Sequence, residues 1–154
     1  HLLSRRQRQM CIRDSYHTPF EAYDESEQHD KYPLYHYCER TRWHLHTQYN
    51  HAPVLRELDP EPYLRMIPVD AEARGIAEGD YVEAYNDRGH CVCKAKFDMG
   101  VRPGMVSSPK GWHRGAYVAG SYQELTCDHL NLLHMNTSFD DTLVEVRKYE
   151  GEVR

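Results

Sequence analysis

The sequence lacks long hydrophobic runs and the motifs of several common enzyme classes. No apolar stretch approaches the roughly 18 residues that a membrane helix needs, and no secretory signal is visible at the start. There is no Gly-rich phosphate loop, no Gly-x-Ser-x-Gly motif, no internal repeat and no low-complexity block. We therefore expect a chain without direct membrane insertion that is neither a P-loop enzyme nor a serine hydrolase.

Cysteine is scarce and is poorly spaced for a metal or redox site. Cys91 and Cys93 face the same way on one predicted strand and lack the C-x-x-C spacing, so we interpret them as small buried residues. His44 and His46 form an H-x-H pair that could ligate a metal, which leaves a small His-ligated metal protein as one alternative. No third ligand stands at a recognisable spacing, so we assign no metal site.

Positive charge is in deficit outside the first fifteen residues. Residues 1–15 contain four arginines and one aspartate and resemble translated sequencing-adapter sequence, so we interpret them as non-native; a basic arm for an anionic partner is the alternative. Without them, 15 basic side chains face 23 acidic ones, a net charge of −8 rather than −5. So acidic a chain is a poor binder of nucleic acid backbones.

The remaining chain divides into a polar linker at 16–30, a barrel domain at 31–149 and a short tail at 150–154. Its most regular stretch is 70–112. Asp70 is placed to N-cap a helix over 71–74, and Gly75 is placed to end that helix. Residues 78–80 are predicted to form a turn. Alternating residues then predict strands at 81–85 and 91–97, joined by a hairpin over 86–89. Further short strands, expected near 32–37, 63–67, 105–108 and 139–146, predict a mainly β fold, a small barrel with a few short helices.

A series of motifs in this stretch carries a family resemblance. They are Asp-Ala at 70–71, Arg-Gly-Ile at 74–76, Gly-Asp-Tyr-Val at 79–82, Asn-Asp-Arg-Gly at 86–89, Arg-Pro-Gly-Met-Val at 102–106 and Gly-Trp at 111–112. Together they resemble the C-terminal dinucleotide-binding domain of the molybdopterin oxidoreductases of the dimethyl sulfoxide reductase family, over about residues 32–149. The resemblance implies a double-psi β-barrel. One departure is Ile67, where many members have Asn before the proline.

The resemblance also implies cofactor-binding residues. In the family, an Arg followed by His-Ser/Thr-Gln lines the molybdopterin guanine dinucleotide site, and a later Asn points at the same cofactor. The matching positions here are Arg42, His46, Thr47, Gln48 and either Asn131 or Asn136. Arginine and amide side chains suit phosphates and heterocycle edges, because they offer several directed hydrogen bonds. The metal ligand of the family lies in an upstream domain, so we name no catalytic residue.

The function implied is that of one wall of the cofactor site in a larger molybdenum or tungsten oxidoreductase with a bis-molybdopterin guanine dinucleotide cofactor. The motifs resemble those of anaerobic reductases and of the catechol dehydroxylase or transhydroxylase branch. The implied partners are the upstream domains of the same enzyme and an iron-sulfur electron-transfer subunit. The isolated chain is expected to be inactive, and the full enzyme to be cytoplasmic or exported in the folded state. A stand-alone double-psi barrel that binds partners without a cofactor is the other alternative.

Overall fold

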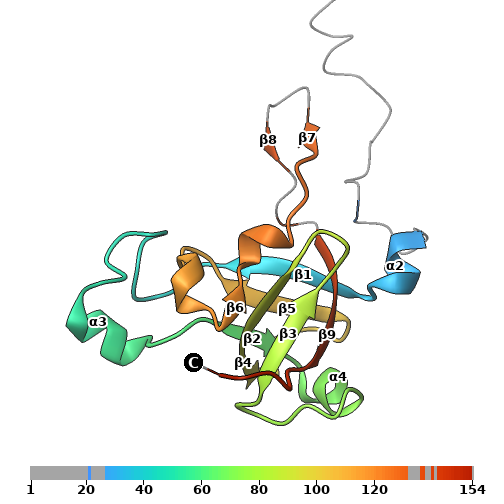
Figure 1. The fold of residues 1–154 in the computed structure, drawn as a ribbon, viewed down its shortest axis with the longest axis horizontal. Helices are drawn as coiled ribbons and strands as arrows, with labels where there is room; N and C mark the ends of the chain where they lie inside the picture. The colour runs from blue at the N-terminus through green and yellow to red at the C-terminus, as the bar shows by residue number, and fades with distance from the viewer. Residues whose placement is uncertain (1–20, 22–26, 132–135, 138–139, 141, 154) are drawn as a thin grey trace, which may run out of the picture.

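Six strands close into a barrel in the computed structural model, which describes Glu21 and residues 27–131, 136–137, 140 and 142–153 (Figure 1). The strand order β2-β5-β1-β9-β3-β4 is closed by pairing of β2 with β4, and β6 continues the sheet beyond β4. The strands are β1 (Leu34–Glu39), β2 (Tyr63–Met66), β3 (Tyr81–Tyr85), β4 (His90–Phe97), β5 (Met105–Pro109), β6 (Ala119–Gly120) and β9 (Thr142–Lys148).

Two of the barrel pairings are parallel. β1 pairs with β5 and β2 pairs with β4 in parallel, whereas the other neighbours in the barrel are antiparallel. Parallel neighbours need long crossover connections, and here the crossovers interleave. The fold is therefore the predicted double-psi β-barrel, mostly strands with a few short helices. These helices are α2 (Glu27–Lys31), α3 (Pro53–Leu58), α4 (Pro68–Glu72) and the 3₁₀ turns η1 (Arg114–Ala116) and η2 (Tyr122–Glu124).

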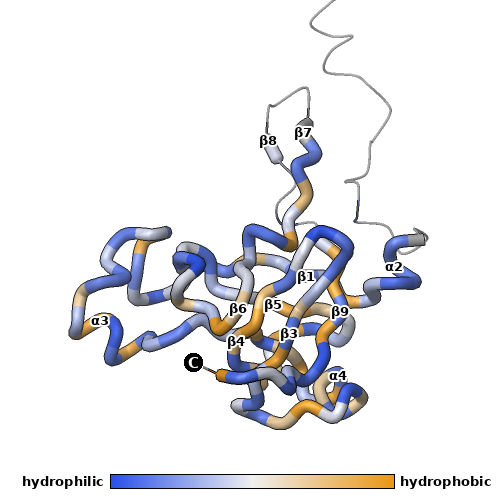
Figure 2. The backbone as a smooth tube through the Cα atoms, viewed as in Figure 1, coloured by the Kyte–Doolittle hydropathy of each residue, from blue (hydrophilic) through white to orange (hydrophobic). Residues whose placement is uncertain are grey.

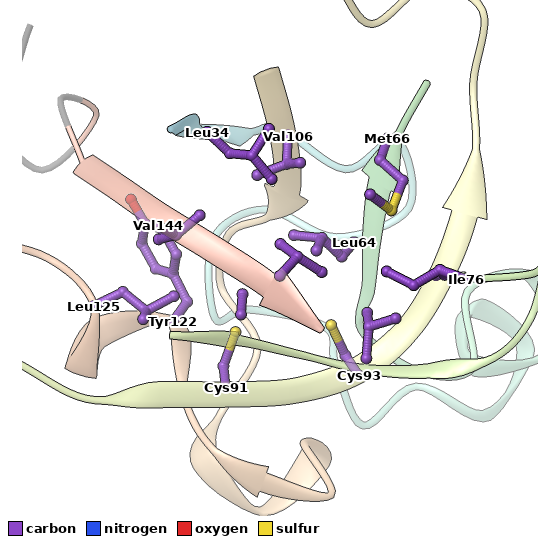
Figure 3. Packing of buried hydrophobic residues seen from close by; sticks show 14 of the residues in the cluster. Leu34, Leu64, Met66, Ile76, Cys91, Cys93, Val106, Tyr122, Leu125 and Val144 are labelled. Atoms are coloured by element: carbon purple, nitrogen blue, oxygen red, sulfur yellow. The ribbon is translucent and has the colours of Figure 1, made fainter. Parts of the chain in front are cut away.

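The barrel interior is the hydrophobic core. Alternation along each strand sends every second side chain inward, so Val82 and Ala84, which share one face of β3, are buried. Cys91 and Cys93 of β4 also point into the core as free thiols, which confirms their interpretation as small buried residues. Figure 3 shows these cysteines packed among Leu64 and other aliphatic side chains from several strands.

The turns that follow α4 form as the sequence predicts. Gly75 has a φ of 66°, and the amides of Gly75 and Ile76 close the helix end on Glu72 and Ala71. This is the left-handed helix end that the glycine predicted. The turn at Gly79, with a φ of 83°, and the hairpin between β3 and β4 also form as predicted.

The N-cap assignment of Asp70 is wrong. α4 begins earlier, at Pro68, because proline has the fixed φ that suits a first helical residue. Ile67 is therefore the N-cap and supplies no side-chain cap. The Asp70 carboxylate instead accepts a hydrogen bond of 2.7 Å from the amide of Gly104, in the turn that leads into β5.

Two long excursions leave the barrel and are mostly hydrophilic (Figures 1 and 2). The first, residues 40–62, follows β1 and contains α3, none of whose residues is buried. The second, residues 121–141, contains η2 and the short hairpin of β7 (Leu130–Asn131) and β8 (Asn136–Thr137). The first excursion has few apolar side chains to bury, so its conformation depends on contacts with the barrel, whereas Tyr122 and Leu125 at the start of the second excursion belong to the core cluster.

Candidate functional site

The segment that follows β1 has an unusual backbone held by several polar contacts. His46 and Tyr49 have φ angles of 53° and 69°, a left-handed conformation that is uncommon outside glycine. The His44 ring places Nδ1 2.9 Å from the His46 carbonyl oxygen, and the Thr41 hydroxyl donates to the His44 carbonyl at 3.1 Å. Such conformations persist only where the surroundings fix them, and they cluster at ligand sites.

The Gly-Trp motif supports this segment from the next crossover. The Asn50 amide donates to the Gly111 carbonyl at 2.6 Å. A Cβ on Gly111, whose φ is 95°, would lie 2.0 Å from the His46 carbonyl oxygen, so only glycine permits this approach. Trp112 packs against the core cluster and meets the His44 ring edge-on at 5.1 Å. Trp112 is thus a packing residue rather than a free stacking surface for a ligand.

A buried His–Asp pair fixes the other side of the segment. His44 Nε2 lies 3.5 Å from Asp59 Oδ2, and both side chains are less than a tenth exposed. Burial raises the pKa of the Asp59 carboxyl, and the charge of His44 opposes the rise. Because Nδ1 of His44 faces a carbonyl oxygen, it carries a proton, and Nε2 faces the carboxylate. The pair therefore orients the ring and, through it, the His46 carbonyl.

A groove of about 500 Å³ lies between the two excursions and the end of β5. His46 and Thr47 line it from the first excursion, and Thr137 lines it from β8. The remaining lining residues include Lys110, Tyr122 and Gln123. The groove offers hydroxyl, amide, imidazole and ammonium groups, a donor set that suits a ligand carrying phosphates and a heterocycle.

The structure brings together part of the predicted site. His46 and Thr47 line the same groove as Thr137 of the β7–β8 hairpin, and Asn131 and Asn136 are register partners within that hairpin. Arg42 and Gln48 are exposed in the first excursion and are not among the residues that line the groove. Arg42 stacks its guanidinium 5.1 Å from the centre of the Trp43 ring.

Three polar residues near the groove were not predicted: the buried His36, the partly buried Cys38 and the exposed Asp140. The Cys38 thiol donates to the Asp140 carboxylate at 2.7 Å, and burial raises the pKa of the thiol. His36 is fully buried, bonds to Ser108 at 2.8 Å and packs against Tyr122; burial lowers its pKa to about 4. In the sequence these residues were part of an ordinary strand pattern. Only the parallel pairing of β1 with β5 shows that His36 and Cys38 lie beside Ser108.

The two histidines of the H-x-H motif have different surroundings. His44 is buried against Asp59 while His46 is exposed, because the left-handed backbone at His46 breaks the strand alternation. In the part of the chain that the structure describes, no three His, Cys, Asp or Glu side chains come together to hold a metal ion.

Comparison with known proteins agrees with this architecture. The family model of the molybdopterin dinucleotide-binding domain matches residues 34–143. The chain belongs to this family, in the dimethyl sulfoxide reductase group of enzymes. The match runs from the first residue of β1 to the second residue of β9, and so includes both excursions.

Three relatives of this molybdopterin dinucleotide-binding domain cover most of the chain. A Halobacterium salinarum protein that is named as the catalytic chain of a dimethyl sulfoxide reductase is 37% identical over 80% of the chain. Pyrogallol hydroxytransferase large subunit of Pelobacter acidigallici is 32% identical over 91%, and trimethylamine-N-oxide reductase 1 of Escherichia coli is 34% identical over 80%. The matched regions make up only 15%, 19% and 16% of those proteins.

A solved structure has the same fold. Acetylene hydratase from Pelobacter acetylenicus superposes with a TM-score of 0.76 over 88% of this chain and 21% of its own, at 18% sequence identity. None of the helices that the structure describes has the length and apolar character of a membrane span.

Proposed function

We propose that this chain is the C-terminal cofactor-binding domain of a larger molybdenum or tungsten oxidoreductase, and that its groove binds part of a bis-molybdopterin guanine dinucleotide cofactor. The observation that carries the proposal is the groove itself, which both Thr47 of the first excursion and Thr137 of the β7–β8 hairpin line. These positions are 90 residues apart and belong to the two segments that the family resemblance assigns to the cofactor.

The residues present fit this ligand. His46 and Thr47 would bond the pterin or its phosphates, while Arg42 and Gln48 would contact parts that extend beyond the groove. Asn131 and Asn136 both remain candidates for an edge of the heterocycle. When bound, the cofactor supplies two-electron redox chemistry; this chain's residues bind and orient it and limit its access to water.

The larger enzyme supplies the rest of the site. We infer that upstream domains hold the metal ligand, and that an iron-sulfur subunit delivers or accepts electrons. The matches to reductases and to a hydroxytransferase support either an anaerobic reductase or a catechol dehydroxylase or transhydroxylase. Sequencing the DNA upstream of this reading frame tests the inference, because a complete gene should encode the remaining cofactor domains. A complete gene without them contradicts it.

The binding proposal is tested by titrating GDP into the full 154-residue chain and measuring heat by calorimetry. Since most of the cofactor site lies elsewhere, we expect weak binding. Thr47→Ala and Gln48→Ala should each weaken it about tenfold, the effect of losing one good hydrogen bond to a phosphate or base. Arg56→Ala, an exposed arginine in α3, is the matched control and should bind as the parent chain does. Equal affinity in all four proteins contradicts the site.

A further inference from the structure

Unsatisfied polar atoms gather beneath the first excursion. Among the residues that the structure describes, seven buried side-chain nitrogen and oxygen atoms lack a hydrogen-bond partner. Four of them, His44 Nε2, Asn50 Oδ1, Asp59 Oδ2 and Trp112 Nε1, belong to residues that line one small hollow next to α3. Because buried polar groups nearly always have a partner, this concentration indicates that the hollow binds something.

Three of these four atoms offer lone pairs. His44 Nδ1 lies 2.9 Å from the His46 carbonyl oxygen, so it carries the ring proton, and Nε2 of the neutral ring is left with a lone pair. Asp59 adds a carboxylate oxygen, and Asn50 adds an amide oxygen. A water molecule has too few protons to donate to all three atoms. A cation can bind all three at once.

The spacing of His44 and Asp59 fits two ligands of one ion better than a hydrogen bond. His44 Nε2 lies 3.5 Å from Asp59 Oδ2, whereas a normal N–H···O bond measures about 2.7–3.2 Å. Two ligand atoms at about 2.1 Å from a tetrahedral zinc ion are about 3.4 Å apart. Both side chains are less than a tenth exposed, as is Asn50, so solvent does not replace such an ion.

Hydrogen bonds on the far side of the ligands fix their orientation. Histidines that bind metals typically donate their other ring N–H to a carbonyl or a carboxylate, as His44 does to the His46 carbonyl. The Asn50 amide nitrogen donates to the Gly111 carbonyl at 2.6 Å, which leaves the Asn50 oxygen for a ligand. Trp112 Nε1 is only a donor and cannot coordinate a metal, but it can donate to a water that completes the coordination.

We propose that His44, Asn50 and Asp59 bind a Zn²⁺ ion or a divalent transition metal of similar preference. Imidazole and carboxylate ligands suit such ions. No three His, Cys, Asp or Glu side chains mark this place in the described ranges of the chain, because the third ligand is an amide. The ion would join the start of the first excursion to the end of α3, and so hold His46 at the groove. The site does not depend on the proposed function.

The test is a calorimetric titration of Zn²⁺ into the full 154-residue chain after treatment with a chelator. We expect the tightest site to take up a single ion per chain. His44→Ala and Asp59→Asn should each lower its affinity at least about a hundredfold, since losing a ligand costs more than the roughly 10–100-fold loss on removing an outer contact. His113→Ala and Glu57→Gln replace exposed residues of the same types and are the matched controls, which should bind Zn²⁺ like the parent chain.

Co²⁺ in place of Zn²⁺ locates the bound ion. The chain has two tryptophans, so Trp43→Phe leaves Trp112, whose ring lies 5.1 Å from the His44 ring. Co²⁺ should quench the fluorescence of Trp112, and Asp59→Asn in the same background should abolish the quenching. Urea unfolding separates binding from folding. Zn²⁺ should raise the midpoint of the parent chain but not that of Asp59→Asn, whereas with chelator Asp59→Asn should unfold no earlier than the parent.

Two results would overturn the metal site. One is a tightest Zn²⁺ site that keeps its affinity in both His44→Ala and Asp59→Asn, because the ion then binds elsewhere. The other is a parent chain that takes up no Zn²⁺ at micromolar concentration, because His44 and Asp59 then form an ordinary ion pair. Neither result changes the expected binding of GDP to the groove, so the metal site and the proposed function are tested separately.

Discussion

The buried ion pair between Glu21 and Arg88 gives a stringent test of how the second excursion is anchored. The Glu21 carboxylate is 1% exposed and lies 67 residues from its partner. Arg88 Nη2 donates to it at 3.0 Å, a second contact comes from Nη1, and the Leu143 amide donates at 2.8 Å. Arg88 also donates through Nε to the Leu125 carbonyl at 2.8 Å.

These contacts join the two ends of the second excursion. Leu125 lies near its start and Leu143 follows it, and the Asn86 amide donates to the carbonyls of both, at 2.9 and 3.1 Å. The Asn-Asp-Arg-Gly hairpin thus holds the base of the segment that carries the β7–β8 hairpin. Glu21 completes the network from the stretch at 16–30 that the sequence pattern predicts to be a linker.

We expect Arg88→Met to destabilise the chain by about 3 kcal/mol. Removing one partner of a buried pair costs about 3–5 kcal/mol because the other charge stays buried. The lower end applies here, since the Arg88 side chain is 29% exposed and the Leu143 amide still bonds the carboxylate. The double variant Glu21→Gln/Arg88→Met should lose about 2 kcal/mol less free energy of unfolding than the two single variants lose together.

The assay is urea unfolding followed by the fluorescence of Trp43 and Trp112. Arg147→Met is the matched control, because Arg147 pairs with Glu83 on the surface with its side chain 63% exposed. Such a pair contributes about 0–1 kcal/mol. A loss for Arg88→Met no larger than that of the control, or strictly additive single losses, refutes the buried network.

Three further predictions concern the barrel and the first excursion. Gly111→Ala should cost at least about 2 kcal/mol in urea unfolding, against about 1 kcal/mol for Gly75→Ala, where an added Cβ meets nothing within 4 Å; equal costs contradict the close approach. Because burial lowers the pKa of His36 from 6.5 to about 4, the unfolded chain binds the proton first as pH falls. Stability should therefore drop by about 3 kcal/mol between pH 6.5 and pH 4, and His36→Gln should flatten this slope in a pH series of unfolding curves. His44→Ala leaves the Asp59 carboxyl buried without its partner and should make residues 40–52 the first site of limited proteolysis, as read by mass spectrometry; an unchanged cleavage map argues against that support.

Local rules predicted the parts of the fold that depend on neighbours in sequence. The glycine turns at 75 and 79, the β3–β4 hairpin and the alternating strand β3 all follow from backbone sterics and alternation, and all form as predicted. Asp70 shows the limit of such rules. Its carboxylate had two possible donors, a helix terminus nearby and the Gly104 amide 34 residues away, and only the fold brings the second within reach.

The groove, and the contacts that hold the segment around His46, could not be predicted from neighbouring residues for the same reason. His46 and Thr47 came from the family resemblance, but the pairing of His44 with Asp59 and the approach of Gly111 depend on packing between crossovers.

The parallel pairing of β1 with β5 therefore links stability to binding. It places the starts of two crossovers at one edge, where one supplies the strained segment around His46 and the other supplies Gly111 to hold it. A substitution that shifts β1 against β5 moves the two sides of the groove relative to each other, although it touches no groove residue. A buried hydrogen bond of 2.8 Å between His36 Nε2 and Ser108 Oγ joins these two strands. Weakening it should lower ligand affinity together with stability, whereas Thr47→Ala should lower affinity alone.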